Sequence, residues 1–178
     1  MNLPNFLTLS RILLIPLFVI LIMNKNFGWA LVTFAVAGIT DGVDGLVARL
    51  THQRTELGAY LDPIADKLLL SAAFITLAID KILPSWLTVI VITRDMIILL
   101  GFFVFLLANR RPKMQPSFIS KITTGFQITT ILLALLRAYE PGFATAFQGA
   151  IYGTTLFTVL SGMHYLYVGT KILGEKAP

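Results

Sequence analysis

Residues 41–66 read DGVDGLVARLTHQRTELGAYLDPIAD, and this stretch joins two apolar segments that each carry two aspartates. Asp41 and Asp44 are three residues apart, and Asp62 and Asp66 are four residues apart. On a helix, both spacings place the two side chains on one face. Because a charge inside a membrane is costly, carboxylates in such segments indicate a functional site. Two such helices side by side would form a cage of four carboxylates, which favours divalent cations.

The whole chain has the composition of a membrane protein. Of its 178 residues, 56% are hydrophobic and 13% are charged, whereas about 25% are charged in a typical soluble domain. There is no cysteine, which excludes disulfides, zinc–thiolate sites and thiol nucleophiles. The start, MNLPNFLTLSR, lacks the basic region and the small-residue cleavage site of a signal peptide. We therefore expect the first apolar segment to be retained.

The apolar segments predict an all-α integral membrane fold with six transmembrane helices. Each is near the ~20 residues that cross a bilayer, and they cover about 8–24, 28–49, 60–79, 84–108, 118–138 and 147–170. A short N-terminal amphipathic surface helix is expected before the first span, where Pro4 suits a helix start. Turns are predicted at 24–28, 80–85 and 140–142, because Asn, Gly and Pro residues lie there. We expect a single membrane domain over residues 1–178.

Basic side chains fall mainly on one side of this arrangement. That side holds Arg11, Arg49, Arg54, Arg110, Arg111, Lys113, Lys121, Lys171 and Lys176, whereas Lys25, Lys81 and Arg137 fall near the other. The positive-inside rule then places both termini and the loops 50–57 and 109–117 in the cytoplasm. The expected location is a bacterial-type inner (cytoplasmic) membrane, with the acidic segments facing the cytoplasm.

Read with its gaps, the opening stretch is D-x2-D-G-x2-A-R-x8-G-x3-D-x3-D, with eight fixed positions from Asp41 to Asp66. It matches, position for position, the signature of the CDP-alcohol phosphotransferase family. The chain resembles that family over its whole length, including the NLPN start and the six predicted spans. The resemblance implies an enzyme that moves a phosphate-containing group from a CDP-linked donor to an alcohol and releases CMP. It also implies a homodimer, and no nucleic-acid partner is expected.

A set of carboxylates without imidazole or thiolate suits hard cations such as Mg²⁺ or Mn²⁺. Two such ions can clamp a diphosphate and neutralise its charge, and a carboxylate beside them can accept the proton of an incoming hydroxyl. The resemblance implies that Asp41, Asp44, Asp62 and Asp66 bind the two metals and that Asp66 is also the general base. It assigns nucleotide binding to Asp41, Gly45, Ala48, Arg49 and Gly58. Lys67, next to Asp66, is interpreted as snorkelling or pairing structurally and not as catalytic.

The acceptor site is predicted from cations outside the motif. Arg94 lies in an apolar run as Thr93-Arg94-Asp95, and Lys121 lies at the cytoplasmic start of the fifth segment. Both are available to an anionic acceptor, with Arg111 as a further candidate. The alternatives are that Arg94 and Asp95 contact other helices and that Lys121 is a positive-inside anchor.

Within the family, the chain resembles both CMP-forming cardiolipin synthases and phosphatidylglycerophosphate synthases. Residues 96–107 carry no second arginine after Arg94. A dianion should need more than one cation, so this favours phosphatidylglycerol, a monoanion, over glycerol 3-phosphate, with the alternative that Arg110, Arg111 or Lys113 supplies the missing charge. The predicted reaction transfers a phosphatidyl group from CDP-diacylglycerol to a glycerol-type alcohol, with phosphatidylglycerol preferred, giving cardiolipin, and glycerol 3-phosphate as the alternative. An ion-coupled transporter built on the acidic cage is disfavoured, because no inverted repeat of discontinuous helices is visible.

Overall fold

The computed structural model describes residues 3–51, 56–107 and 118–174, and it is helical almost throughout these ranges. Their side chains are described except at 3–9, 41–51, 56–63, 102–107, 141 and 172–174. The elements are α1 (Leu3–Met23), α2 (Phe27–Thr51), α3 (Glu56–Ile79), α4 (Ser85–Leu107), α5 (Phe118–Tyr139), η1 (Pro141–Phe143) and α6 (Ala144–Gly174). No strand occurs in the three described ranges, so the all-α prediction is confirmed for them.

Each predicted apolar segment corresponds to one of the helices α1 to α6, but the start of the chain differs from the prediction. The surface helix that was expected ahead of the first span is not a separate element, because α1 runs without a break from Leu3 to Met23. The physical reason is that no glycine or second proline follows Pro4 before residue 16 to end a first helix.

The turns after α1 and α3 share one pattern of backbone hydrogen bonds. In the first, the N–H of Asn26 donates to the carbonyl of Leu21 and that of Lys25 donates to Ile22. The second turn repeats this pattern with Ile82 and Lys81 as donors. This is a Schellman motif, whose left-handed position is usually glycine. Here lysine occupies it, with φ of 58° at Lys25 and 59° at Lys81.

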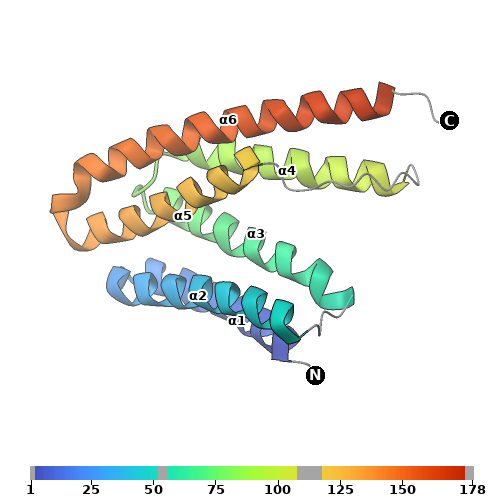
Figure 1. Cartoon of the computed structure of the whole chain (residues 1–178). Coiled ribbons are helices and arrows are strands. Elements are labelled where there is room, and N and C mark those ends of the chain that lie inside the picture. The colour runs from blue at the N-terminus through green and yellow to red at the C-terminus, as the bar shows by residue number, and fades with distance from the viewer. Residues whose placement is uncertain (1–2, 52–55, 108–117, 175–178) are drawn as a thin grey trace.

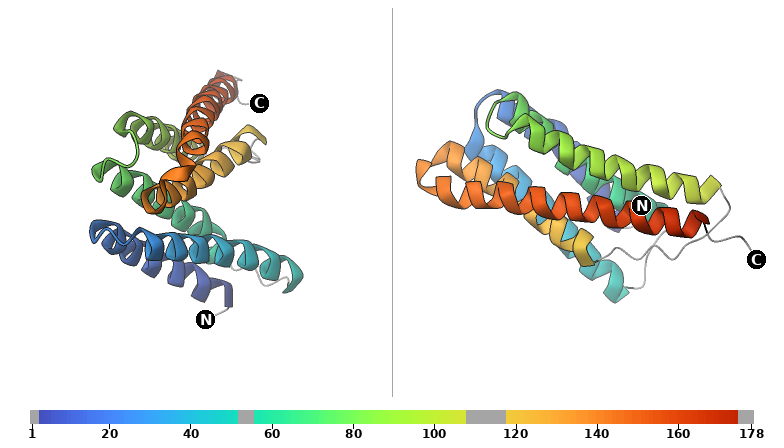
Figure 2. Two further views of the ribbon diagram at one scale, coloured as in Figure 1. Left: turned by 90° about the vertical axis from the view of Figure 1, so that its left-hand side faces the viewer. Right: turned by 90° about the horizontal axis from the view of Figure 1, so that it is seen from above.

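The helices form three successive hairpins (Figure 1). The hairpin turns lie toward one end of the molecule, and both chain ends lie toward the other. Figures 1 and 2 show α1 and α2 together on one side of α3, and α4 and α6 on its other side. Helix α5 packs along α6 and also contacts α2 and α3, so it joins the two groups.

The apolar core lies in the half of the bundle nearest the turns. Phe18 of α1 and Phe34 of α2 meet there with ring centroids 5.8 Å apart. Phe74 and Leu87 bring α3 and α4 to the same cluster, and Leu135 brings α5. The half that carries the chain ends holds the acidic stretch and the buried polar side chains described below. The apolar core and the candidate site therefore lie at different ends of the bundle.

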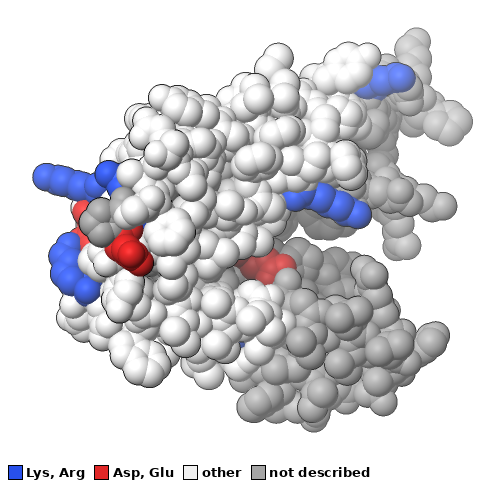
Figure 3. Space-filling view, turned by 60° about the vertical axis from the view of Figure 1, so that its left-hand side comes forward, with Lys and Arg blue, Asp and Glu red and all other residues white. Residues whose placement is uncertain are grey.

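The outer surface is apolar along much of its length. Large exposed apolar side chains occur on every helix from α1 to α6, for example Leu13, Val36, Ile75, Val89 and Leu156. In Figure 3, a broad area without Lys, Arg, Asp or Glu separates the charged side chains of the left-hand end from those farther to the right. An apolar surface of this extent indicates contact with a membrane or a partner protein.

Helix α5 is the one helix in the described part of the chain that is long and apolar enough to cross a membrane. The apolar stretches Ser10–Met23 and Phe27–Thr40 are shorter than a full span. The residues that the structure describes therefore contain one clear candidate span, and the number of six stays a prediction.

Candidate active site

The aspartate motif lies on the two helices that the sequence predicted. Asp41 and Asp44 lie in α2, and Asp62 and Asp66 lie in α3. Since both segments are helical, each pair shares one face of its helix. Helix α1 packs against both α2 and α3, so it contacts both helices that carry the motif.

Most side chains of the motif lie outside the described residues. This holds for the predicted metal ligands Asp41, Asp44 and Asp62 and for the predicted nucleotide contacts Gly45, Ala48, Arg49 and Gly58. Arg111 also lies outside them. The described side chains contain no group of three or more His, Cys, Asp or Glu residues that could hold a metal, and they include only one of the four predicted ligands. The convergence of the four carboxylates therefore stays a prediction.

The described member of the motif, Asp66, is paired with an arginine from α1. Nη1 of Arg11 donates to Oδ1 of Asp66 at 2.6 Å. The Arg11 side chain is 1% exposed, whereas that of Asp66 is 40% exposed. A buried guanidinium thus holds one oxygen of a carboxylate that solvent or substrate can still reach. Charge-assisted bonds of this kind are short and directional, so Arg11 restricts the orientation of Asp66.

Sequence reasoning counted Arg11 only among the charges that set topology. A usable signal was present, because Arg11 falls inside the first predicted span, 8–24. A charged side chain within a span pairs with another charge or with backbone carbonyls. Applied to Arg11, that rule would have directed attention to the aspartates.

The second described cluster surrounds Arg94 of α4, which is 3% exposed. Its Nε and Nη2 donate to Oγ of Ser161 in α6, at 3.1 and 2.6 Å, and Nη2 also donates to Oγ of Ser120 in α5, at 2.7 Å. The guanidinium carbon lies 5.7 Å from the ring centroid of Tyr165. Arg94 therefore contacts other helices, α5 and α6, as one of the two predicted alternatives stated. Whether it also contacts an acceptor stays a prediction.

Asp95 accepts from two cations through a single oxygen. Nη1 of Arg94 lies 2.7 Å and Nζ of Lys67 2.8 Å from Oδ1 of Asp95. Because Lys67 belongs to α3 and Asp95 to α4, this ion pair links the two helices. The interpretation of Lys67 as a structural partner is confirmed.

The two described acceptor candidates lie near one another. Lys121 is exposed in the first turn of α5, and it follows Ser120, which Arg94 contacts. Lys121 thus directly follows a residue that the buried arginine contacts, in the first turn of α5.

Comparison with known proteins gives matches over most of the chain. The family model described as CDP-alcohol phosphatidyltransferase matches residues 1–161, a range that includes the complete motif. A probable CMP-forming cardiolipin synthase of Drosophila melanogaster is 36% identical over 93% of this chain and 57% of its own length. The CMP-forming cardiolipin synthase of Homo sapiens is 31% identical over 96% of this chain and 62% of its own length.

A bacterial relative is matched over nearly its full length. The CDP-diacylglycerol–glycerol-3-phosphate 3-phosphatidyltransferase of Bacillus subtilis is 34% identical over 92% of this chain and 93% of its own length. The chain spans only 57% and 62% of the two animal relatives. The names of these relatives divide between two acceptors, so the comparisons leave the acceptor open.

Proposed function

The chain belongs to the CDP-alcohol phosphatidyltransferase family, and on this premise we propose that it transfers a phosphatidyl group from CDP-diacylglycerol to a glycerol-type alcohol and releases CMP. The observation that carries the proposal is the family match over residues 1–161, which includes all eight fixed motif positions. The motif also lies on two helices, as its spacing requires.

Asp66 serves as the general base in this reaction. The acceptor hydroxyl oxygen bonds to the phosphorus that carries the diacylglycerol, the bond from that phosphorus to the oxygen of CMP breaks, and the hydroxyl proton passes to the Asp66 carboxylate. The ion pair with buried Arg11 supports this role, because it fixes the carboxylate while leaving it 40% exposed. Such orientation matters for the rate, since a misplacement of about 1 Å can cost roughly 100-fold.

Two divalent cations, Mg²⁺ or Mn²⁺, would be held by Asp41, Asp44, Asp62 and Asp66. The donor set fits them, since it consists of carboxylates at helical spacings on α2 and α3. When bound, the cations supply neutralisation of the diphosphate charge. The cytidine nucleotide would contact residues of both helices, namely Asp41, Gly45, Ala48 and Arg49 of α2 and Gly58 of α3.

The acceptor would approach from α4 and α5. Arg94 already donates to Ser120, Ser161 and Asp95. It therefore acts mainly by holding the start of α5, and Lys121, together with Arg111, supplies charge to the acceptor. Phosphatidylglycerol is the preferred acceptor, giving cardiolipin, because its single negative charge needs fewer cations. Glycerol 3-phosphate is the second candidate, and the name of the Bacillus subtilis relative supports it.

The six helices would cross a bacterial-type inner membrane as one domain, residues 1–178, with the site facing the cytoplasm and the chain acting as a homodimer. The exposed apolar side chains along every helix support this placement. Trp29, Trp86, Tyr139 and Tyr152 are exposed near the hairpin turns. Trp and Tyr are enriched at membrane–water interfaces, so this end matches the outer boundary of a bilayer.

The proposal is tested with purified protein, CDP-diacylglycerol and Mn²⁺ or Mg²⁺, each alcohol being offered separately. CMP release is measured, and the lipid product is identified by mass spectrometry. We expect phosphatidylglycerol to give the highest rate and chelation to abolish turnover. Cardiolipin synthesis without any divalent ion would contradict the metal assignment, and exclusive use of glycerol 3-phosphate would reverse the choice of acceptor.

Site variants separate the role of Asp66 from general effects of lost charge. Asp66→Asn and Asp62→Asn are expected to abolish CMP release. Asp80→Asn removes the same charge from an aspartate at the opposite end, where it pairs with Lys25, and turnover should persist. Wild-type turnover in Asp66→Asn would refute the assigned base.

A further inference from the structure

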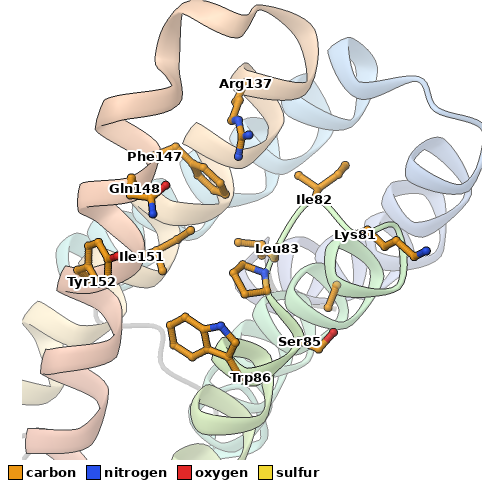
Figure 4. A pocket seen from close by; sticks show the side chains of 12 residues that line it. Lys81, Ile82, Leu83, Ser85, Trp86, Arg137, Phe147, Gln148, Ile151 and Tyr152 are labelled. Atoms are coloured by element: carbon orange, nitrogen blue, oxygen red, sulfur yellow. The ribbon is translucent and has the colours of Figure 1, made fainter.

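A cavity of about 560 Å³ lies at the hairpin-turn end of the bundle. It is bounded by the α3–α4 turn, the last turn of α5 and the start of α6 (Figure 4). Its wall on α3 begins at Ala78, twelve residues after Asp66, which is about 18 Å along a helix. It is therefore separate from the aspartate motif.

The lining is cationic and rich in hydrogen-bond donors. Arg137 and Lys81 line the cavity, and its described lining contains no Asp or Glu. Ser85, Trp86 and Gln148 add neutral donors. Within the described part of the chain, neither Arg137 nor Lys81 forms an ion pair. This balance of charge fits an anion.

The two cations are placed differently. The guanidinium carbon of Arg137 lies 5.0 Å from the ring centroid of Phe147, and Figure 4 shows this group directed toward Phe147 at the cavity wall. The amine of Lys81 points away from the cavity in the same view. Arg137 is therefore held in place for an anion, whereas Lys81 contributes charge from the rim. A planar guanidinium also matches two oxygens of a phosphate group.

The surroundings favour a lipid over a free anion. Ile82, Leu83 and Ile151 give the cavity an apolar wall beside its donors. Trp86 and Tyr152 are exposed at its edge, and Val89 and Leu156 continue an apolar outer surface from them. This order of charge, aromatic ring and apolar surface is that of a membrane interface. We propose that the cavity binds the phosphodiester headgroup of an anionic phospholipid, with Arg137 as its main contact.

The proposal rests on the membrane placement given above but not on the catalytic activity. It is tested on the full chain in detergent, with phosphatidylglycerol and with phosphatidylcholine of identical acyl chains. Bound lipids are counted by native mass spectrometry, and the unfolding midpoint is followed as lipid is added. The wild type should retain phosphatidylglycerol preferentially and be stabilised by it.

The variant Arg137→Gln should bind phosphatidylglycerol about tenfold more weakly, the effect of losing one charge-assisted contact. Arg137→Lys keeps the charge and should recover part of the binding. Lys81→Gln should have a smaller effect. Lys171→Gln, which removes a charge at the far end of α6, should have none. Phosphatidylglycerol bound at the catalytic end would survive Arg137→Gln, so only loss in that variant reports on the cavity.

Three outcomes would overturn the proposal. The first is that Arg137→Gln retains as many phosphatidylglycerol molecules as the wild type. The second is equal retention of phosphatidylcholine by the wild type. The third is stabilisation by inorganic phosphate alone that Arg137→Gln abolishes, since it would assign the cavity to a soluble anion. Recovery of the chain from the aqueous fraction without detergent would instead contradict the membrane placement itself.

Discussion

Replacing Asp95 by asparagine tests the polar centre of the bundle most directly. In the wild type, one carboxylate oxygen of Asp95 serves both Arg94 and Lys67, at 2.7 and 2.8 Å. Arg94 is 3% and Asp95 6% exposed, so both are cut off from water. Asparagine keeps the shape and one acceptor but removes the negative charge that Arg94 and Lys67 share. Breaking a buried ion pair in this way costs about 3–5 kcal/mol, because the remaining charge is left uncompensated.

Lys67→Met is the matched comparison, since it removes the other contact of the same oxygen. The Lys67 side chain is 27% exposed, and Arg94 and Asp95 remain paired without it. We therefore expect a loss of about 0–1 kcal/mol. At about 2–4 °C per kcal/mol for a chain of this size, Asp95→Asn should lower the unfolding midpoint in detergent by roughly 6–20 °C and Lys67→Met by a few degrees at most.

Comparing the midpoint shifts of Asp95→Asn and Lys67→Met shows whether Arg94 or Lys67 is the main partner of Asp95. Equal losses in Asp95→Asn and Lys67→Met would mean that the lysine, and not the buried arginine, is the partner that matters. An unchanged midpoint in Asp95→Asn would refute the reasoning altogether, because it would show that Arg94 needs no counter-charge in the folded protein.

Three further predictions concern α1, α5 and α6. Arg11→Met should lower kcat about 10- to 100-fold through misorientation of Asp66, and Arg11→Lys should lower it less. A steady-state CMP assay in which Arg11→Met matches the wild-type rate would contradict the positioning role. Gly153→Ala should destabilise by about 1–3 kcal/mol, because its Cβ would lie 2.5 Å from a ring carbon of Phe126, which stacks on Phe157. A Cβ added at Gly125 meets no atom within 4 Å, so Gly125→Ala should stabilise by up to about 1 kcal/mol. In thermal unfolding, Gly153→Ala should therefore lower the midpoint and Gly125→Ala should raise it. Gln127→Leu should stabilise by about 1–3 kcal/mol, since neither amide atom of this fully buried side chain has a partner among the described residues; a lower midpoint would show that the amide is bonded after all.

The positions of the helices followed from the sequence, because long apolar segments alternate with short clusters of helix-ending residues. Pro84 precedes α4 and Pro141 follows α5, where helix termini were expected. The ends of α1 and α3 were placed correctly, but their conformation was not foreseen. A lysine at position 25 or 81 does not predict a left-handed backbone, because the hydrogen bonds of the turn impose that geometry.

The candidate site could be predicted only where its chemistry is local. The motif spacing depends on one helix at a time, and α2 and α3 have the helical backbone that it needs. Contacts between Arg11 and Asp66 or between Lys67 and Asp95 join positions 55 and 28 residues apart. Such pairs depend on which helices become neighbours, and helical periodicity carries no information on that.

The two lysine turns described above have a consequence for stability engineering. Glycine at position 25 or 81 would relieve the left-handed backbone by about 1 kcal/mol. It would also remove a cation from a helix C-terminus, where such a charge is worth about 0.3–1 kcal/mol. At position 25 the same change would break the pairing with Asp80. The obvious stabilising mutation is therefore close to neutral in both hairpins, and an engineer gains more from Gly125 than from either turn.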